Sequence, residues 1–249
     1  AELLAANYSI TELRDDGITA AELKAESKLV SHLKSDYTIA ELKVAYEIDE
    51  LLVEFTFAQL RTGGVTATEM KAAGKLASEL VGIYTVAELL VAVYSISELK
   101  AASVTATQFK AEQKTVSDLK VDYSISELKV PYSIDELLVE FTLSELRTGG
   151  VSAAEMKAAG KFASELLAVY SLAELLAGLY SITELEAASV TSTQLKAEGK
   201  TVAELLGIYS VAELLDALYT LTELKQGGVS ATQLKAENKL VAELLGVYT

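Results

Sequence analysis

The sequence of 249 residues contains no cysteine, no tryptophan, one proline and one histidine. Without cysteine the chain can form neither disulfides nor thiolate metal sites, although this absence does not choose a cellular compartment. With a single histidine, His32, the chain has no pair of imidazole ligands for a transition metal. A catalytic nucleophile could also have no histidine base other than His32. Neither glycine-rich phosphate-binding motif is present. We therefore expect no metal, no cofactor and no enzymatic activity.

Basic residues are also scarce, with 21 lysines and arginines against 36 aspartates and glutamates and a net charge of −15. This balance opposes binding to nucleic acid or to an anionic membrane surface, because both require clustered positive charge. No run approaches the roughly 18 consecutive apolar residues of a membrane-spanning helix, so we expect no membrane insertion. The 51% hydrophobic content is nevertheless enough for a sizeable core.

A short pattern fills the whole sequence and returns every nine or ten residues, as in Tyr180–Leu185. In it a Ser or Thr precedes a Glu by three residues, which is the capping box that begins a helix. The clearest capping pairs are Ser181 with Glu184 and Ser133 with Glu136. Gln replaces the acid at 59, 108, 194 and 233. Because Gln can cap a helix but cannot act as a general acid, the pattern favours capping over catalysis.

The units predict an all-α solenoid that runs as one array over residues 1–249. A leucine follows the acid in most units, and small residues or glycine then end a helix of about seven residues. Helices this short are marginal alone, so they must stack on neighbouring units to form a continuous core. We expect about four or five units in each superhelical turn.

Six units begin with lysine, at 28, 75, 114, 161, 200 and 239, and four of these carry Leu or Phe where the capping hydroxyl is expected. We interpret these units as continuations of the helix before them, giving one helix of about 17 residues with an amphipathic spacing. Gly74, Gly160 and Gly199 would lie inside those helices. A break at the glycines is the alternative.

The units are grouped into larger modules. Modules begin at Ile18, Val65, Val104, Val151, Val190 and Val229, with spacings of 47 or 39 residues. Residues 37–113 return almost unchanged 86 residues later. The sequence thus predicts a hierarchy of units, modules and one duplication.

A second set of leucines recurs one position after the buried leucine, where other units have lysine. The set contains Leu52, Leu90, Leu138, Leu176 and Leu215. These residues form either additional core or a lateral contact with another copy of the chain.

The sequence begins in the middle of a unit at Ala1 and stops at Tyr248 and Thr249, where a helix would start. Either it is a piece of a longer array, or copies join head to tail, and a contact that does not close makes a fibre. Leu3, Leu4, Val247 and Tyr248 are the residues expected at such a joint. We therefore hypothesise a structural protein that polymerises into a filament or a surface fibre, a role that favours the extracellular space or the cell surface while the sequence leaves the compartment open. The alternative is an acidic scaffold that binds another protein on its concave face.

Overall fold

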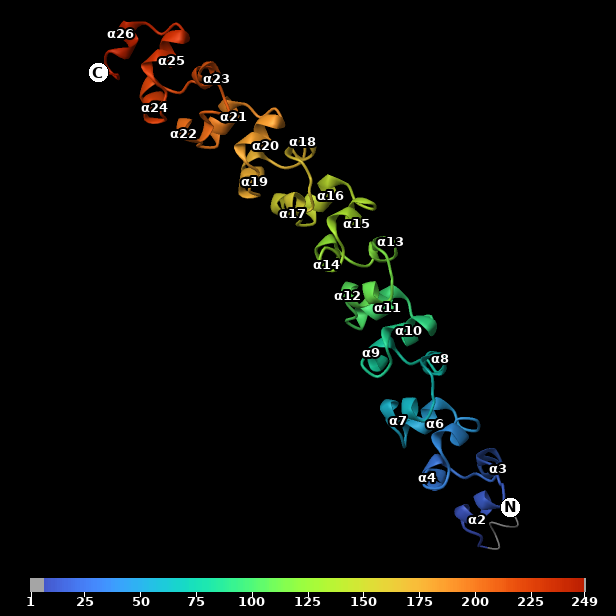
Figure 1. The fold of residues 1–249 in the computed structure, drawn as a ribbon. Coiled ribbons are helices and arrows are strands. Elements are labelled where there is room, and N and C mark those ends of the chain that lie inside the picture. The colour runs from blue at the N-terminus through green and yellow to red at the C-terminus, as the bar shows by residue number, and fades with distance from the viewer. Residues whose placement is uncertain (1–6, 249) are drawn as a thin grey trace. The chain divides into compact units, whose positions relative to one another are not determined.

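The computed structural model describes residues 7–248, and within this range the chain forms 25 short helices and no β-strand. This confirms the all-α repeat solenoid. Figure 1 shows the helices following one another along the chain, with a turn after each. The chain divides into two compact units, Ala1–Tyr123 and Ser124–Thr249, and the repeat runs through both. The single array predicted over 1–249 stays a prediction.

The helices contain four to six residues, which is shorter than the sequence predicted. In the first compact unit they are α2 (Ile10–Asp15), α3 (Ala20–Ala25), α4 (Val30–Leu33), α5 (Ile39–Leu42), α6 (Ile48–Leu52), α7 (Phe57–Thr62), α8 (Ala67–Ala72), α9 (Ala77–Leu80), α10 (Val86–Val91), α11 (Ile96–Ala101), α12 (Ala106–Ala111) and α13 (Val116–Leu119). In the second they are α14 (Ile125–Leu128), α15 (Ile134–Leu138), α16 (Leu143–Thr148), α17 (Ala153–Ala158), α18 (Ala163–Leu166), α19 (Leu172–Ala177), α20 (Ile182–Ala187), α21 (Ser192–Ala197), α22 (Val202–Leu205), α23 (Val211–Asp216), α24 (Leu221–Gln226), α25 (Ala231–Ala236) and α26 (Val241–Leu244).

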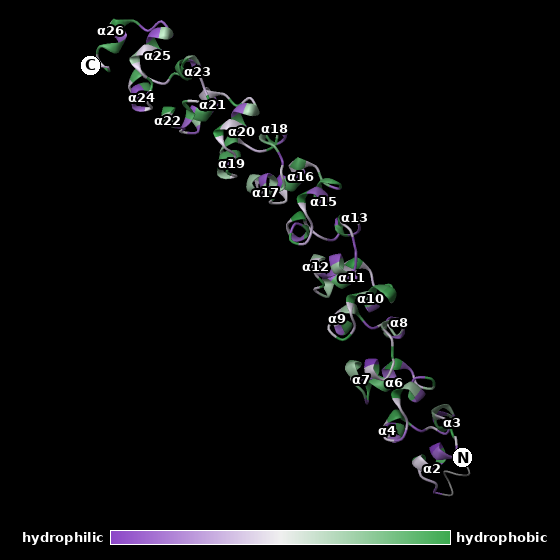
Figure 2. Ribbon diagram, viewed as in Figure 1, coloured by the Kyte–Doolittle hydropathy of each residue, from purple (hydrophilic) through white to green (hydrophobic). Residues whose placement is uncertain are grey.

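The core is built from one large residue in each helix, the leucine that follows the capping acid. From Leu33 to Leu234 this position is fully buried, whether it holds Leu, Met or Phe. Hydrophilic and hydrophobic residues alternate within the same short helices in Figure 2, because the capping positions face solvent. Full burial of a leucine contributes about 1.5–3 kcal/mol per unit. This burial supplies the stabilising free energy that a single turn of helix lacks on its own.

The prediction of long fused helices at the lysine units is wrong, and the alternative of a break is confirmed. Helix α8 ends at Ala72, Gly74 adopts a left-handed φ of +75°, and α9 begins only at Ala77. Leu76 stands in the capping position with an extended backbone, and its N–H donates to Glu79 Oε2 at 2.6 Å. Half of a capping box is therefore enough to begin a new helix.

Units that lie two apart along the chain are packed against each other. The closest helix pairs include α8 with α10, α9 with α11, α17 with α19, α18 with α20 and α22 with α24. The expected four or five units per turn is therefore too many. Each helix is about one turn long, so the connecting turns follow quickly and bring the chain back after two units.

The first glycine of the Gly63–Gly64 pair is required by this packing. A Cβ at Gly63 would lie 2.4 Å from the Cβ of Ile39, which comes from the unit two before it. Gly64 meets no neighbour but has a φ of +86°. The pair thus combines a close approach with a left-handed turn, and neither is open to most residues.

We predict that Phe162→Ser stabilises the protein. The Phe162 side chain is 73% exposed and does not cap α18, so a serine there would complete the box with Glu165 and contribute about 0.5–2 kcal/mol. Phe162→Ala is the matched control, because it removes the ring without adding a cap. Chemical denaturation should rank the serine variant above the alanine variant; equal midpoints would contradict the prediction.

Candidate functional site

The repeated polar pair of each unit closes the start of its own helix. In α20 the Ser181 N–H donates to Glu184 Oε2 at 2.6 Å, and the Glu184 N–H donates to Ser181 Oγ at 3.2 Å. In α15 the corresponding bonds between Ser133 and Glu136 measure 2.7 and 3.2 Å. These bonds pair N–H groups that a helix start otherwise leaves open.

His32 fills the place of the capping acid in α4. Its Nδ1 accepts the Leu29 N–H at 3.0 Å. The imidazole is exposed, and this bond gives it the same structural role that Glu79 has in α9.

In several units, a lysine or arginine from the unit three before it binds the capping acid. Lys157 Nζ lies 2.7 Å from Glu184 Oε2, 2.6 Å from the Leu179 carbonyl oxygen and 4.8 Å from the centre of the Tyr180 ring. We call this arrangement of a cation, a tyrosine ring and a capping acid the inter-unit latch. Arg147 forms the same latch with Tyr170 and Glu174. The latch joins units that are not adjacent in sequence.

The tyrosine of the latch also reaches backwards, to a unit two before its own. The Tyr180 hydroxyl donates to the Lys161 carbonyl oxygen at 2.6 Å, 19 residues upstream. The same bond joins Tyr37 to Ile18, Tyr46 to Lys28, Tyr84 to Val65, Tyr94 to Lys75, Tyr123 to Val104, Tyr170 to Val151, Tyr209 to Val190, Tyr219 to Lys200 and Tyr248 to Val229. Every acceptor is the first residue of an Ile, Val or Lys unit. Burial raises the pKa of Tyr84 to about 12.

The latch lowers the pKa of the capping acid that it binds. The Lys157 ammonium and the capping bonds from Ser181 lower the pKa of Glu184 to about 2, because all of them stabilise the carboxylate. The residues in the lysine's place before Gln108, Gln194 and Gln233 are apolar, but Lys34 stands there before Gln59. Apolar residues also stand opposite capping acids, as Leu138 does before Glu165. The latch therefore does not decide between glutamate and glutamine.

The five predicted contact leucines, Leu52, Leu90, Leu138, Leu176 and Leu215, are half-buried. Each stands in the latch position but opposite a lysine unit. On α6 and α15, which carry two of them, Asp49 binds Lys75 and Asp135 binds Lys161 at 2.8 Å. These leucines thus stand beside an ion pair inside the array, which favours additional packing over a free lateral face.

The large exposed apolar residues lie elsewhere, at positions that the sequence did not predict as contacts. They include Leu29, Leu76, Phe162 and Leu240, which stand at the capping position of four lysine units and are 60–73% exposed. The sequence signal for this exposure was a hydrophobic residue at a capping position, because the capping side chain faces solvent.

The predicted end-contact residues give a divided result. Leu3 and Leu4 lie outside the described residues. Val247 and Tyr248 are half-buried and held by their own chain, because Tyr248 donates to Val229 and Lys225 lies 5.4 Å from its ring centre. The uncovered apolar surface lies one helix earlier, on α26.

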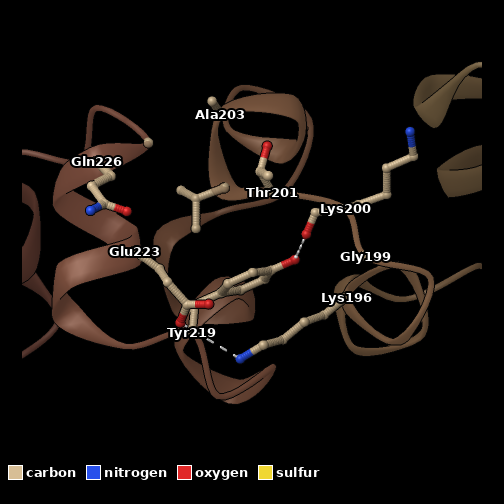
Figure 3. A pocket seen from close by; sticks show the side chains of 10 residues that line it. Lys196, Gly199, Lys200, Thr201, Ala203, Tyr219, Glu223 and Gln226 are labelled. Atoms are coloured by element: carbon tan, nitrogen blue, oxygen red, sulfur yellow. Dashed lines mark hydrogen bonds and ion pairs between the residues drawn. The ribbon is translucent and has the colours of Figure 1, made fainter.

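Open grooves lie beside several of the latches. The groove in Figure 3 has a volume of about 400 Å³ and is lined by Lys196, Lys200, Val202, Tyr219 and Glu223. A groove at Arg14 and Tyr37 has a volume of about 670 Å³, and one on α25 and α26 about 660 Å³.

Residues 7–248 contain no group of three or more His, Cys, Asp or Glu side chains that could hold a metal ion. In the same range, no helix combines the length and the apolar character needed to cross a bilayer. Comparison with protein-family models, with curated proteins and with solved structures found no match.

We predict that the two halves of the latch contribute unequally. Tyr180→Phe leaves the Lys161 carbonyl without its partner and should cost about 1–3 kcal/mol. Lys157→Met keeps the side-chain stem but removes a partly exposed charge and should cost less than about 1 kcal/mol. Urea denaturation of both variants measures the order; a larger loss for Lys157→Met would contradict it.

Acid should weaken the array between pH 4.5 and pH 2. The pKa values of Glu41, Glu174, Glu184 and Glu204 are lowered to about 2 from an ordinary value of 4.5. Carboxylates with lowered pKa values stabilise the fold fully above pH 4.5 and lose this contribution as pH falls through 2. A variant with glutamine at all four positions keeps neutral caps, so its denaturation midpoint should fall less over this range. An equal fall in both proteins would contradict the prediction.

Proposed function

We propose that this protein is a structural repeat protein whose copies assemble end to end into a filament. The observation that carries the proposal is the sameness of the units: the same position is fully buried from Leu33 to Leu234, and units two apart pack against each other, so the units of one copy can pack on those of another. The exposed face of α26 shows which side chains such a contact would cover. Val241 is 73% exposed, whereas Val30, Val116 and Val202 hold the same position in other lysine units and are 2–4% exposed. Leu240 and Leu245 beside it are also exposed.

The interior of the array indicates what normally covers this face. Val202 on α22 is covered by the end of α24, where a Cβ at Gly227 would lie 2.4 Å from the Cβ of Val202. The natural cover is therefore another unit of the same kind, two units further along. A second copy of the chain carries such units, and a contact between two different surfaces of one chain continues indefinitely into a fibre.

A protein partner is the second candidate, supported by the exposed Leu29, Leu76, Phe162 and Leu240. Apolar residues that replace polar caps at one repeated position support contact with another protein surface. Leu76→Ser and Phe162→Ser together would remove half of these side chains without touching α26.

The proposal is tested by following assembly with sedimentation velocity and electron microscopy over a range of concentrations. Val241→Asp should abolish the assemblies and leave the monomer folded, because the residue is exposed in a single chain. Val139→Asp is the matched control. Val139 is 79% exposed like Val241, but it caps the C-terminal end of α15 and lies away from α26.

Wild-type chains that stay monomeric at millimolar concentration would overturn the proposal. So would equal disruption by Val139→Asp. Assembly that survives Val241→Asp but is lost in the Leu76 and Phe162 double variant would shift the contact to the capping positions.

A further inference from the structure

We propose that Asn7 is an N-glycosylation site, at which an oligosaccharide is attached to the side-chain amide. Asn7, Tyr8 and Ser9 form the acceptor motif for this modification, which is asparagine, any residue except proline, then serine or threonine. Asn238 is the only other asparagine in the sequence, and Leu240 stands two residues after it, so the motif occurs once. The inference is independent of the end-to-end assembly.

The repeat itself creates this motif. The last residue of a ten-residue unit forms a left-handed turn, and the capping hydroxyl of the next unit follows two residues later, as Ser181 follows Leu179. Asn7 has a φ of 63°, and Ser9 caps α2. Asparagine is one of the few residues with a side chain that adopt this conformation readily. An asparagine at the turn therefore becomes an acceptor wherever the next unit begins with a hydroxyl.

The turn position leaves room for a bulky group. The side chain of Asn7 is exposed. At the same position of other units, Val93, Leu179 and Leu218 are 76–79% exposed, and a Cβ added at Gly150 would meet no atom within 4 Å. The exposure is thus a property of every such turn in the repeat. An N-linked oligosaccharide is bulky and hydrophilic, and this turn accommodates it without rearrangement of the fold.

The capping box of α2 sets the time at which the transfer occurs. Ser9 Oγ donates to Glu12 Oε2 at 2.7 Å and accepts the Glu12 N–H at 3.2 Å. The acceptor motif requires this hydroxyl, and in the folded chain the helix occupies it. The transferase therefore meets Asn7 before α2 forms, on a chain that is entering a secretory compartment.

The reaction needs a donor of one chemical class, an oligosaccharide linked through pyrophosphate to a lipid. The side-chain nitrogen Nδ2 of Asn7 attacks the anomeric carbon of the first sugar and forms a C–N bond. The bond from that carbon to the pyrophosphate oxygen breaks, and the lipid pyrophosphate leaves with the electron pair. One amide proton passes to a base of the transferase, so the reaction involves no oxidation or reduction.

The first test is mass spectrometry of the protein isolated from the cells that make it. Trypsin should release a peptide that ends at Arg14 and carries an oligosaccharide on Asn7. Peptide-N-glycosidase should remove the oligosaccharide and leave aspartate at this position. An unmodified Asn7 throughout the preparation would overturn the proposal.

The second test secretes the full chain from a eukaryotic cell line and follows its electrophoretic mobility before and after peptide-N-glycosidase. The wild type should show a shift that the enzyme removes. Asn7→Gln should abolish the shift, whereas Ser9→Thr should keep it, because threonine serves both the motif and the cap. Leu240→Ser creates the motif at Asn238 and should add a second shift. Leu240→Ala is its matched control and should add none.

The outcomes decide between Asn7 and the turn position in general. A wild-type chain that emerges unmodified, while Leu240→Ser is modified at Asn238, would overturn the proposal, because the host is then shown to modify this turn but not Asn7. A shift that persists in Asn7→Gln would also overturn it. Loss in Asn7→Gln with retention in Ser9→Thr supports Asn7 as the acceptor.

Discussion

A helix of one turn cannot hold itself together, and this constraint governs the whole structure. Nucleating a helix fixes several residues for the first hydrogen bond, so four to six residues do not recover the cost alone. Helix α20 shows the three supports that the array provides. A capping box pairs its first N–H groups, a fully buried leucine anchors its middle, and groups from units two and three away reach its ends.

The acidic composition follows from this requirement. Most of the acids that begin the helices are occupied in caps, and those facing a lysine or arginine serve a second time in the latch. The net charge of −15 is therefore largely a by-product of beginning so many helices.

The latch also stabilises backbone that would otherwise be strained. Val93, Leu179 and Leu218 adopt left-handed φ values of 62–64°, a conformation that costs a residue with a side chain about 1–2 kcal/mol. Their carbonyl groups accept hydrogen bonds from Lys71, Lys157 and Lys196. Other units use glycine, asparagine, serine or, at Gln113, glutamine at the same turn. The three apolar residues occur where a lysine binds the carbonyl group of the turn.

The sequence by itself determined the local structure, because capping depends on residues three apart. Ser181 with Glu184 predicts a helix start, and the alternation of Tyr, Val and Lys units marks the modules. It failed at Phe162 and Leu76, where a lone acid three residues later begins a helix that the missing hydroxyl seemed to forbid. Only the tertiary structure decided which units touch. The bond from Tyr180 to Lys161 and the pair of Lys157 with Glu184 span 19 and 27 residues, and these separations depend on how sharply each short helix turns the chain, which no local pattern specifies.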